Sequence, residues 1–180
     1  MKGSFFGKMA GLTQSPPRVS GAEVFWSWLG SFLGIAAVAY LNDGFLEKTD
    51  LVLIIGSFGA SAVLIYGALK SPLAQPRNLL GGHVISALIG VSAWKLLFFA
   101  PWLAAALAVS VSIAVMHLTK TLHPPGGATA LIAVIGGPKV HHLGYLYVLM
   151  PVAAGALIML AVALLVNNLA PTRRYPEYWF

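Results

Sequence analysis

Charged residues divide this chain into long apolar windows. A helix that crosses the ~30 Å hydrocarbon core of a membrane needs about 20 apolar residues, and six windows between successive charges come near that length. The fifth window is short and opens with two prolines, so a re-entrant half-helix is its alternative. We expect six spans, near residues 24–41, 51–69, 79–98, 102–118, 121–136 and 145–168.

Composition supports a lipid environment. Of the 180 residues, 58% are hydrophobic and 9% charged, against about 25% charged in soluble domains. We expect an all-α membrane protein with a cytoplasmic segment (1–23, lacking signal-peptide features), one transmembrane domain (24–168) and a cytoplasmic tail (169–180). Because the chain has no cysteine, disulfides and thiolate metal sites are excluded. We expect no cofactor, no metal and no nucleic-acid partner.

The basic residues predict the orientation. Six spans place both termini on one side, and the positive-inside rule makes that side the cytoplasm. Only Lys48, Lys95 and Lys139 would then lie outside, together with an acidic loop that carries Asp43, Glu47 and Asp50. We expect a bacterial cytoplasmic membrane protein whose inner basic residues are Lys2, Lys8, Arg18, Lys70, Arg77, Lys120, Arg173 and Arg174. Gly30 and Gly34, four residues apart, suit close helix packing, and a homo-oligomer interface is one place for it.

Two short stretches resemble each other at an offset of 68 residues. Gly56–Ala62 reads GSFGASA and Pro124–Ala130 reads PGGATA after its first proline, so both end in Gly-Ala-hydroxyl-Ala. Three spans in each half would make the halves, about 24–98 and 102–168, an inverted repeat of the kind common in secondary transporters. Chance similarity is the alternative, since glycine and alanine abound in membrane helices.

The motif from His123 to Ala130 carries the most chemistry. Proline disfavours helical geometry in the residue before it and suits the first helical turn, so we expect an extended His123 and a helix start within the membrane. A helix N-terminus is a ready anion site, and the matching stretch adds a second one. The expected solute contacts are Ser57, Gly59, Ala60, Ser61, His123, Pro124, Pro125, Gly126, Gly127, Ala128 and Thr129. Tight packing alone is the other interpretation of these small residues.

The His-Pro-Pro motif with its Gly-Gly-Ala-Thr-Ala continuation resembles the signature of the HPP family of integral membrane proteins. The stretches at 56–62, 71–78 and 81–83 resemble its other blocks. The resemblance runs from about residue 24 to residue 168. It implies a transporter-like membrane protein, since plastid and cyanobacterial members are linked to nitrite transport, but it does not fix nitrite as the solute here.

Several further side chains are candidates. His83, within the third span, is a functional candidate because histidine inside a membrane helix is rare, and Asn78 opens the same span. His123 is a candidate for solute binding or for taking up a proton that moves with the solute. Arg77 and Lys120 would supply charge at the inner mouth, although anchoring explains Arg77 equally well. His141 and His142 are expected to be polar loop residues rather than metal ligands.

The favoured function is transport of, or a channel for, a small inorganic anion, with nitrite as the first candidate. All five acidic residues lie outside the expected spans, whereas a cation carrier often places a carboxylate in the membrane. One alternative is an intramembrane serine hydrolase that uses Ser61 and His83, although its usual Gly-x-Ser-Gly motif is missing. The other alternative is a membrane subunit that transports nothing. We expect no enzymatic activity, and lipid and a small anion as partners.

Overall fold

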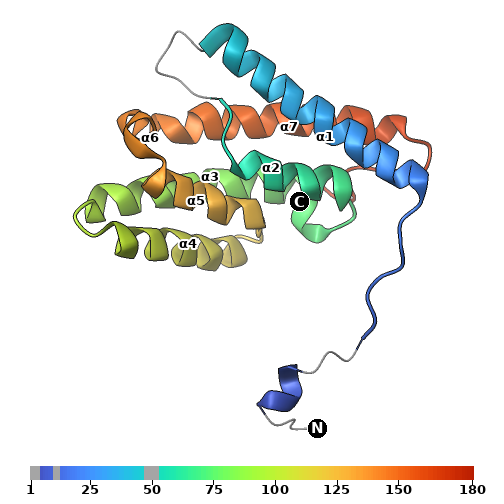
Figure 1. Cartoon of the computed structure of the whole chain (residues 1–180). Helices are drawn as coiled ribbons and strands as arrows, with labels where there is room; N and C mark the ends of the chain where they lie inside the picture. The colour runs from blue at the N-terminus through green and yellow to red at the C-terminus, as the bar shows by residue number, and fades with distance from the viewer. Residues whose placement is uncertain (1–4, 10–12, 47–52) are drawn as a thin grey trace.

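The computed structural model describes residues 5–9, 13–46 and 53–180. Within those residues every regular element is helical. Figure 1 shows long helices running side by side, with the shorter α2 and α5 between them. The elements are η1 (Phe6–Met9), α1 (Gly21–Leu41), η2 (Asn42–Leu46), α2 (Ser57–Ala62), η3 (Val63–Gly67), η4 (Pro72–Ala74), α3 (Pro76–Leu97), α4 (Pro101–Leu118), α5 (Pro124–Ile135), α6 (Gly137–Leu143), η5 (Val148–Ala153) and α7 (Ala154–Leu169).

The predicted spans agree closely with these helices. Among the described residues, four helical segments are long and apolar enough to cross a membrane: residues 21–44, 76–97, 101–118 and 148–169. The other two expected spans correspond to shorter apolar helices, 57–67 and 124–135. The helix of the fifth span is thus closer in length to the half-helix alternative than to a full span. The helix of the second span is about as short. The chain is an all-helical membrane protein.

The two halves share one pattern of helix lengths. Each contains a long helix, a short apolar helix and a second long one: α1, α2 with η3, and α3, then α4, α5, and η5 with α7. The two similar stretches open the short helix of each half, as expected. The inverted repeat itself stays a prediction, and Glu47, Lys48 and Asp50 of the expected outer loop lie outside the described residues.

Close packing of α3 against α5 forms the centre of the bundle. A Cβ atom on Gly82 of α3 would lie 2.5 Å from the Cβ of His123 and 2.9 Å from the carbonyl oxygen of Thr121. On the other side, a Cβ on Gly126 would lie 2.7 Å from the carbonyl oxygen of Gly82. These glycines let the two backbones approach to a distance that no other residue permits.

The glycine pair of the first span packs within the chain. A Cβ on Gly30 would lie 2.6 Å from Tyr66 Cδ1, and one on Gly34 would overlap the Tyr66 hydroxyl. Both glycines are buried, and Tyr66 is completely so. The two glycines thus pack against Tyr66 of η3 in the same chain. A homo-oligomer interface would have to use other residues.

Several basic residues lie at one end of the bundle. Arg77 at the start of α3 donates to the carbonyl oxygen of Thr119 at the end of α4 (2.7 Å), and the start of α1 meets the residues after α7 through Glu23 and Arg173. Lys95 lies at the opposite end of α3. The prediction that His141 and His142 lie in a loop was wrong, because both belong to the short helix α6. Gly136 and Pro138 allow a new helix to start there.

Candidate functional site

Five polar side chains form a buried cluster in the centre of the bundle. Ser57 and Ser61 come from α2, His83 from the second turn of α3, His123 from the residue before α5, and Thr129 from α5 itself. Each is at most 1% exposed. We call these five residues the histidine cluster. Sequence reasoning placed all five in the candidate site, and the fold brings them into contact.

Ser61 lies between the two histidines. Its Oγ is 2.7 Å from His83 Nε2 and 2.9 Å from His123 Nε2. The two rings meet edge to face with their centroids 5.0 Å apart. Phe58 contacts the other side of His83, with ring centroids 5.4 Å apart. The hydroxyl is thus held by two imidazoles in an otherwise apolar setting.

Hydrogen bonds continue the cluster at both ends. His83 Nδ1 lies 2.7 Å from Thr129 Oγ1, which donates to Ser57 Oγ (2.8 Å) and to the carbonyl oxygen of Pro125 (3.2 Å). At the other end His123 Nδ1 lies 2.8 Å from the carbonyl oxygen of Leu73 in η4. The hydroxyls that match across the two similar stretches, Ser61 and Thr129, therefore bind opposite nitrogens of His83.

The starts of the two short helices offer fewer backbone donors than expected. Pro124 and Pro125 have no N–H, and the Gly126 N–H is bonded to the carbonyl oxygen of His123 (2.8 Å). At α2 the N–H groups of Phe58 and Gly59 are likewise bonded, to Ile55 and Gly56. At these positions the N–H groups are therefore not free donors. The histidine cluster supplies polar side chains in both breaks.

Other expected site residues lie outside the cluster. Gly59 and Ala60 are exposed on the far side of α2. Pro124, Gly127 and Ala128 line an apolar groove of about 540 Å³ between α4 and α5. The expected solute contacts on α2 and α5 therefore divide into a buried polar face and an outer apolar one.

Asn78 and the two mouth residues have structural contacts. Asn78 Nδ2 donates to the carbonyl oxygen of Leu122 (2.9 Å), beside the cluster, while its buried Oδ1 has no partner among the described residues. Arg77 binds Thr119, and the exposed Lys120 follows α4 in a left-handed turn (φ 55°). Arg77 and Lys120 thus lie at the same end of the bundle, where a charged mouth was expected.

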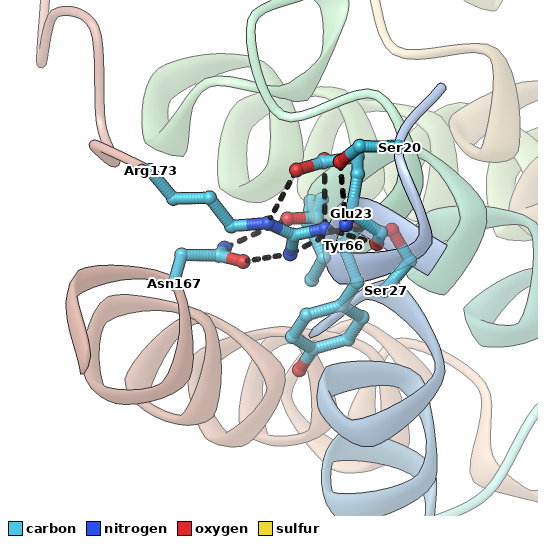
Figure 2. Close-up of polar contacts among 7 residues, drawn as sticks. Ser20, Glu23, Ser27, Tyr66, Asn167 and Arg173 are labelled. Atoms are coloured by element: carbon cyan, nitrogen blue, oxygen red, sulfur yellow. Dashed lines mark hydrogen bonds and ion pairs between the residues drawn. The ribbon is translucent and has the colours of Figure 1, made fainter. Parts of the chain in front are cut away.

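A second polar cluster was missed by sequence reasoning. Figure 2 shows the Arg173 guanidinium, which is 1% exposed, surrounded by oxygen acceptors. It makes a two-pronged ion pair with Glu23 (2.7 and 3.1 Å) and donates to Ser27 Oγ (2.7 Å), Asn167 Oδ1 (3.0 Å) and the carbonyl oxygen of Tyr66 (3.2 Å). We call these five residues the arginine cluster. Glu23, expected before the first span, lies in the first turn of α1.

A family comparison agrees with a helical membrane fold. The model of the HPP transmembrane region matches residues 16–176, which is nearly the whole chain. The chain belongs to the HPP family. All of the histidine cluster and all of the arginine cluster lie within the matched HPP region, so both are features of a membrane domain of this family.

Two relatives of this HPP chain are transmembrane proteins of Dictyostelium discoideum. One is 48% identical over 179 residues, which is 98% of this chain and 57% of the relative. The other is 46% identical over 173 residues, or 94% of this chain and 60% of the relative. The chain thus spans less than two thirds of the length of these curated relatives. No solved structure matches it.

Proposed function

We propose that this HPP protein carries a small inorganic anion, nitrite first, across the membrane through the histidine cluster. The supporting observation is a fully buried group of three hydroxyls and two imidazoles where two interrupted helices meet. Such side chains donate hydrogen bonds, and the cluster contains no carboxylate to repel an anion. Non-helical backbone at membrane depth is tolerated where it is buried in protein or lines a path.

The cluster side chains contact one another in this conformation, so the solute replaces some of those contacts when it binds. An anion that enters between Ser61 and Thr129 would take donors from both interrupted helices at once. The two short helices, which carry the three hydroxyls of the cluster, are the segments we expect to move. Alternating exposure of the cluster to the two sides is the mechanism we favour over an open channel.

Flux measurements test this function. Purified protein in proteoliposomes should take up nitrite above protein-free vesicles and with saturation, and formate and nitrate should compete. Ser61→Ala should lower the initial rate by at least about ten-fold, because it removes the hydroxyl that both rings contact. Ser110→Ala, an exposed hydroxyl on α4, is the matched control. If folded, inserted protein transports none of the three anions, the proposal fails and the non-transporting subunit becomes the better assignment.

A serine hydrolase is the second candidate, because Ser61 Oγ and His83 Nε2 are in hydrogen-bond contact. A histidine in that position can accept the serine proton. Against it, Ser61 is completely buried and His83 is oriented by a threonine rather than by a carboxylate. Covalent labelling by a fluorophosphonate that disappears in Ser61→Ala would favour the hydrolase. Nitrite flux without labelling would favour transport.

Orientation and assembly complete the proposal. We place the end that carries Arg77, Lys120 and Arg173 in the cytoplasm, with both termini there, and we keep a bacterial inner membrane and a homo-oligomer as predictions. Since the chain has no cysteine, single-cysteine variants report sidedness cleanly. Thr172→Cys should react with an impermeant maleimide only in inside-out vesicles, and Gly44→Cys only in right-side-out ones. The reverse pattern would invert the assignment.

A further inference from the structure

Hydrogen positions in the histidine cluster follow from its heavy-atom contacts. A carbonyl oxygen only accepts, so His123 Nδ1, 2.8 Å from the oxygen of Leu73, must carry a hydrogen. In a neutral ring the other nitrogen then has a lone pair. His123 therefore presents an acceptor, Nε2, to the hydroxyl of Ser61.

The same reasoning applies to His83. The single hydroxyl hydrogen of Thr129 is directed to Ser57 Oγ and to the Pro125 carbonyl oxygen. The 2.7 Å contact between Thr129 Oγ1 and His83 Nδ1 then needs its hydrogen from the histidine. His83 Nε2 is consequently a second acceptor that faces Ser61.

Two acceptors thus converge on one hydroxyl. Ser61 has one hydrogen, and its Oγ lies 2.7 Å from one Nε2 and 2.9 Å from the other. With both rings neutral, one of these two contacts contains no hydrogen. A single added proton completes the arrangement: one ring becomes an imidazolium and donates to Ser61, and Ser61 donates to the other ring.

We infer that His83, Ser61 and His123 form a binding site for one proton, and that this proton is transported together with the anion. The inference rests on the proposed function for its transport part. The binding step forms one N–H bond at the Nε2 of either ring and adds one positive charge. When the proton leaves, both rings are neutral again and one of the two contacts of Ser61 lacks its hydrogen.

Charge balance links the proton to the anion. A buried charge without a partner is costly, and the described surroundings supply no anion to the cluster. Among the elements that pack against the cluster, α2, α5 and η5 contain no charged residue. Helix α3 carries two cations: Arg77 is bonded to the carbonyl oxygen of Thr119, and Lys95 lies beside the ring of Tyr145. Glu23 of α1 is paired with Arg173, and His117 ends α4 in an exposed position. Tyr147 donates to the Thr129 carbonyl oxygen (3.1 Å). An entering anion is therefore the natural counter-charge.

Proton-coupled flux gives the first test. In proteoliposomes loaded with a pH dye, nitrite uptake above that of protein-free vesicles should acidify the interior by about one proton per anion. An inside-alkaline gradient should accelerate uptake, and an imposed potassium diffusion potential should change the rate by less than about two-fold, because the pair carries no net charge. Nitrite uptake that follows the potential and moves no proton would overturn the inference while leaving anion transport in place.

Spectroscopy tests the site when no flux is found. A variant with His117→Gln, His141→Gln and His142→Gln keeps only the two cluster histidines. Its ¹⁵N-histidine spectrum in bilayers, recorded with nitrite present from about pH 8 to about pH 5, should show one ring becoming an imidazolium while the other stays neutral. Introducing Ser61→Ala should remove this one-proton behaviour. Two neutral rings throughout, or two rings that protonate together, would overturn the proton site irrespective of transport.

Discussion

The histidine cluster and the arginine cluster are both buried, but their charges are matched differently. Arg173 has a carboxylate and four further acceptors around it, including the backbone oxygen of Glu23 (2.9 Å), so its charge is compensated in the folded state. The histidine cluster has only neutral hydroxyl and carbonyl partners. A compensated ion pair resists change, whereas a neutral network with an incomplete set of hydrogens can accept a proton and a solute. We therefore expect stability to depend on the arginine cluster, and the proposed transport to depend on the histidine cluster.

The two clusters are connected through the residues that follow α7. The backbone beyond Arg173 runs to Tyr175, whose hydroxyl donates to the carbonyl oxygen of Ala74 (2.8 Å). The N–H of Glu177 donates to Gln75 Oε1 (2.9 Å). Both contacts hold the η4 region, where the Leu73 carbonyl binds His123. The arginine cluster thus fixes one end of a support that orients the histidine cluster.

The largest effect is expected from Arg173→Met. The change leaves Glu23, Asn167 and the Tyr66 carbonyl without their donor, and breaking a buried pair costs about 3–5 kcal/mol. Because Glu23 is 27% exposed, we expect a loss of about 3 kcal/mol in the free energy of unfolding. Unfolding in mixed micelles of rising dodecyl sulfate content measures it. Arg174→Met, at an exposed position, should change stability by less than about 0.5 kcal/mol; equal losses would refute the role of the arginine cluster.

Gly82→Ala should have the next largest effect. Its Cβ would lie 2.5 Å from the His123 Cβ, so α3 and α5 must separate, at a cost of about 1–3 kcal/mol for overpacking. The same separation would disturb the contacts of His123 and lower nitrite flux. Gly59→Ala is the control, because Gly59 is exposed with nothing within 4 Å of an added Cβ. It should leave stability unchanged or raise it by up to about 1 kcal/mol. Similar losses in both variants would mean that close packing is not what Gly82 provides.

Most of the helix positions could be predicted from the sequence, because charges and prolines mark the helix ends. The spans expected at 79–98 and 102–118 are the helices 76–97 and 101–118, each opened by a proline. The short lengths of α2 and α5 were harder to predict. The apolar window that contains α2 also includes residues 53–56, which are apolar but not helical. Hydropathy measures how apolar a segment is and not where its helical bonds begin.

The candidate site could be predicted in its members but not in its geometry. Ser61, His83 and Thr129 were unusual polar residues in apolar segments, which is a signal that sequence carries. That Ser61 bridges both histidines depends on a close approach of α2, α3 and α5. Arg173 was interpreted as one more cytoplasmic cation, and a conventional charge count offers no sign of a partner 150 positions away, at Glu23.

Thr129→Val should separate function from stability. Valine keeps the shape but removes the hydroxyl that bonds His83 Nδ1 and Ser57. We expect a stability loss of about 1–2 kcal/mol from the unpaired groups, together with at least about ten-fold slower nitrite uptake per folded protein. Thr129→Ser should restore most of the uptake, because serine keeps the hydroxyl.

The opposite pattern in Arg173→Met would complete the contrast, with uptake falling only as folded protein is lost. If Thr129→Val instead transports at the wild-type rate, the histidine cluster is a packing element. The two clusters would then differ in their residues but not in their role.

The smallest effect is expected from Tyr175→Phe, which tests the support between the clusters. Losing the buried hydrogen bond to the Ala74 carbonyl oxygen should lower the free energy of unfolding by about 1 kcal/mol. It should slow nitrite uptake only slightly. Burial raises the pKa of the Tyr175 hydroxyl above its ordinary value. Its neutral form therefore stabilises the fold below about pH 10, and that contribution falls as the pH rises further. The stability advantage of the wild type over Tyr175→Phe should accordingly shrink in alkaline solution. Tyr178→Phe, at an exposed position, should cost less at neutral pH. If the advantage stays constant, the tail holds η4 through the bond between Glu177 and Gln75, and Tyr175 only fills space.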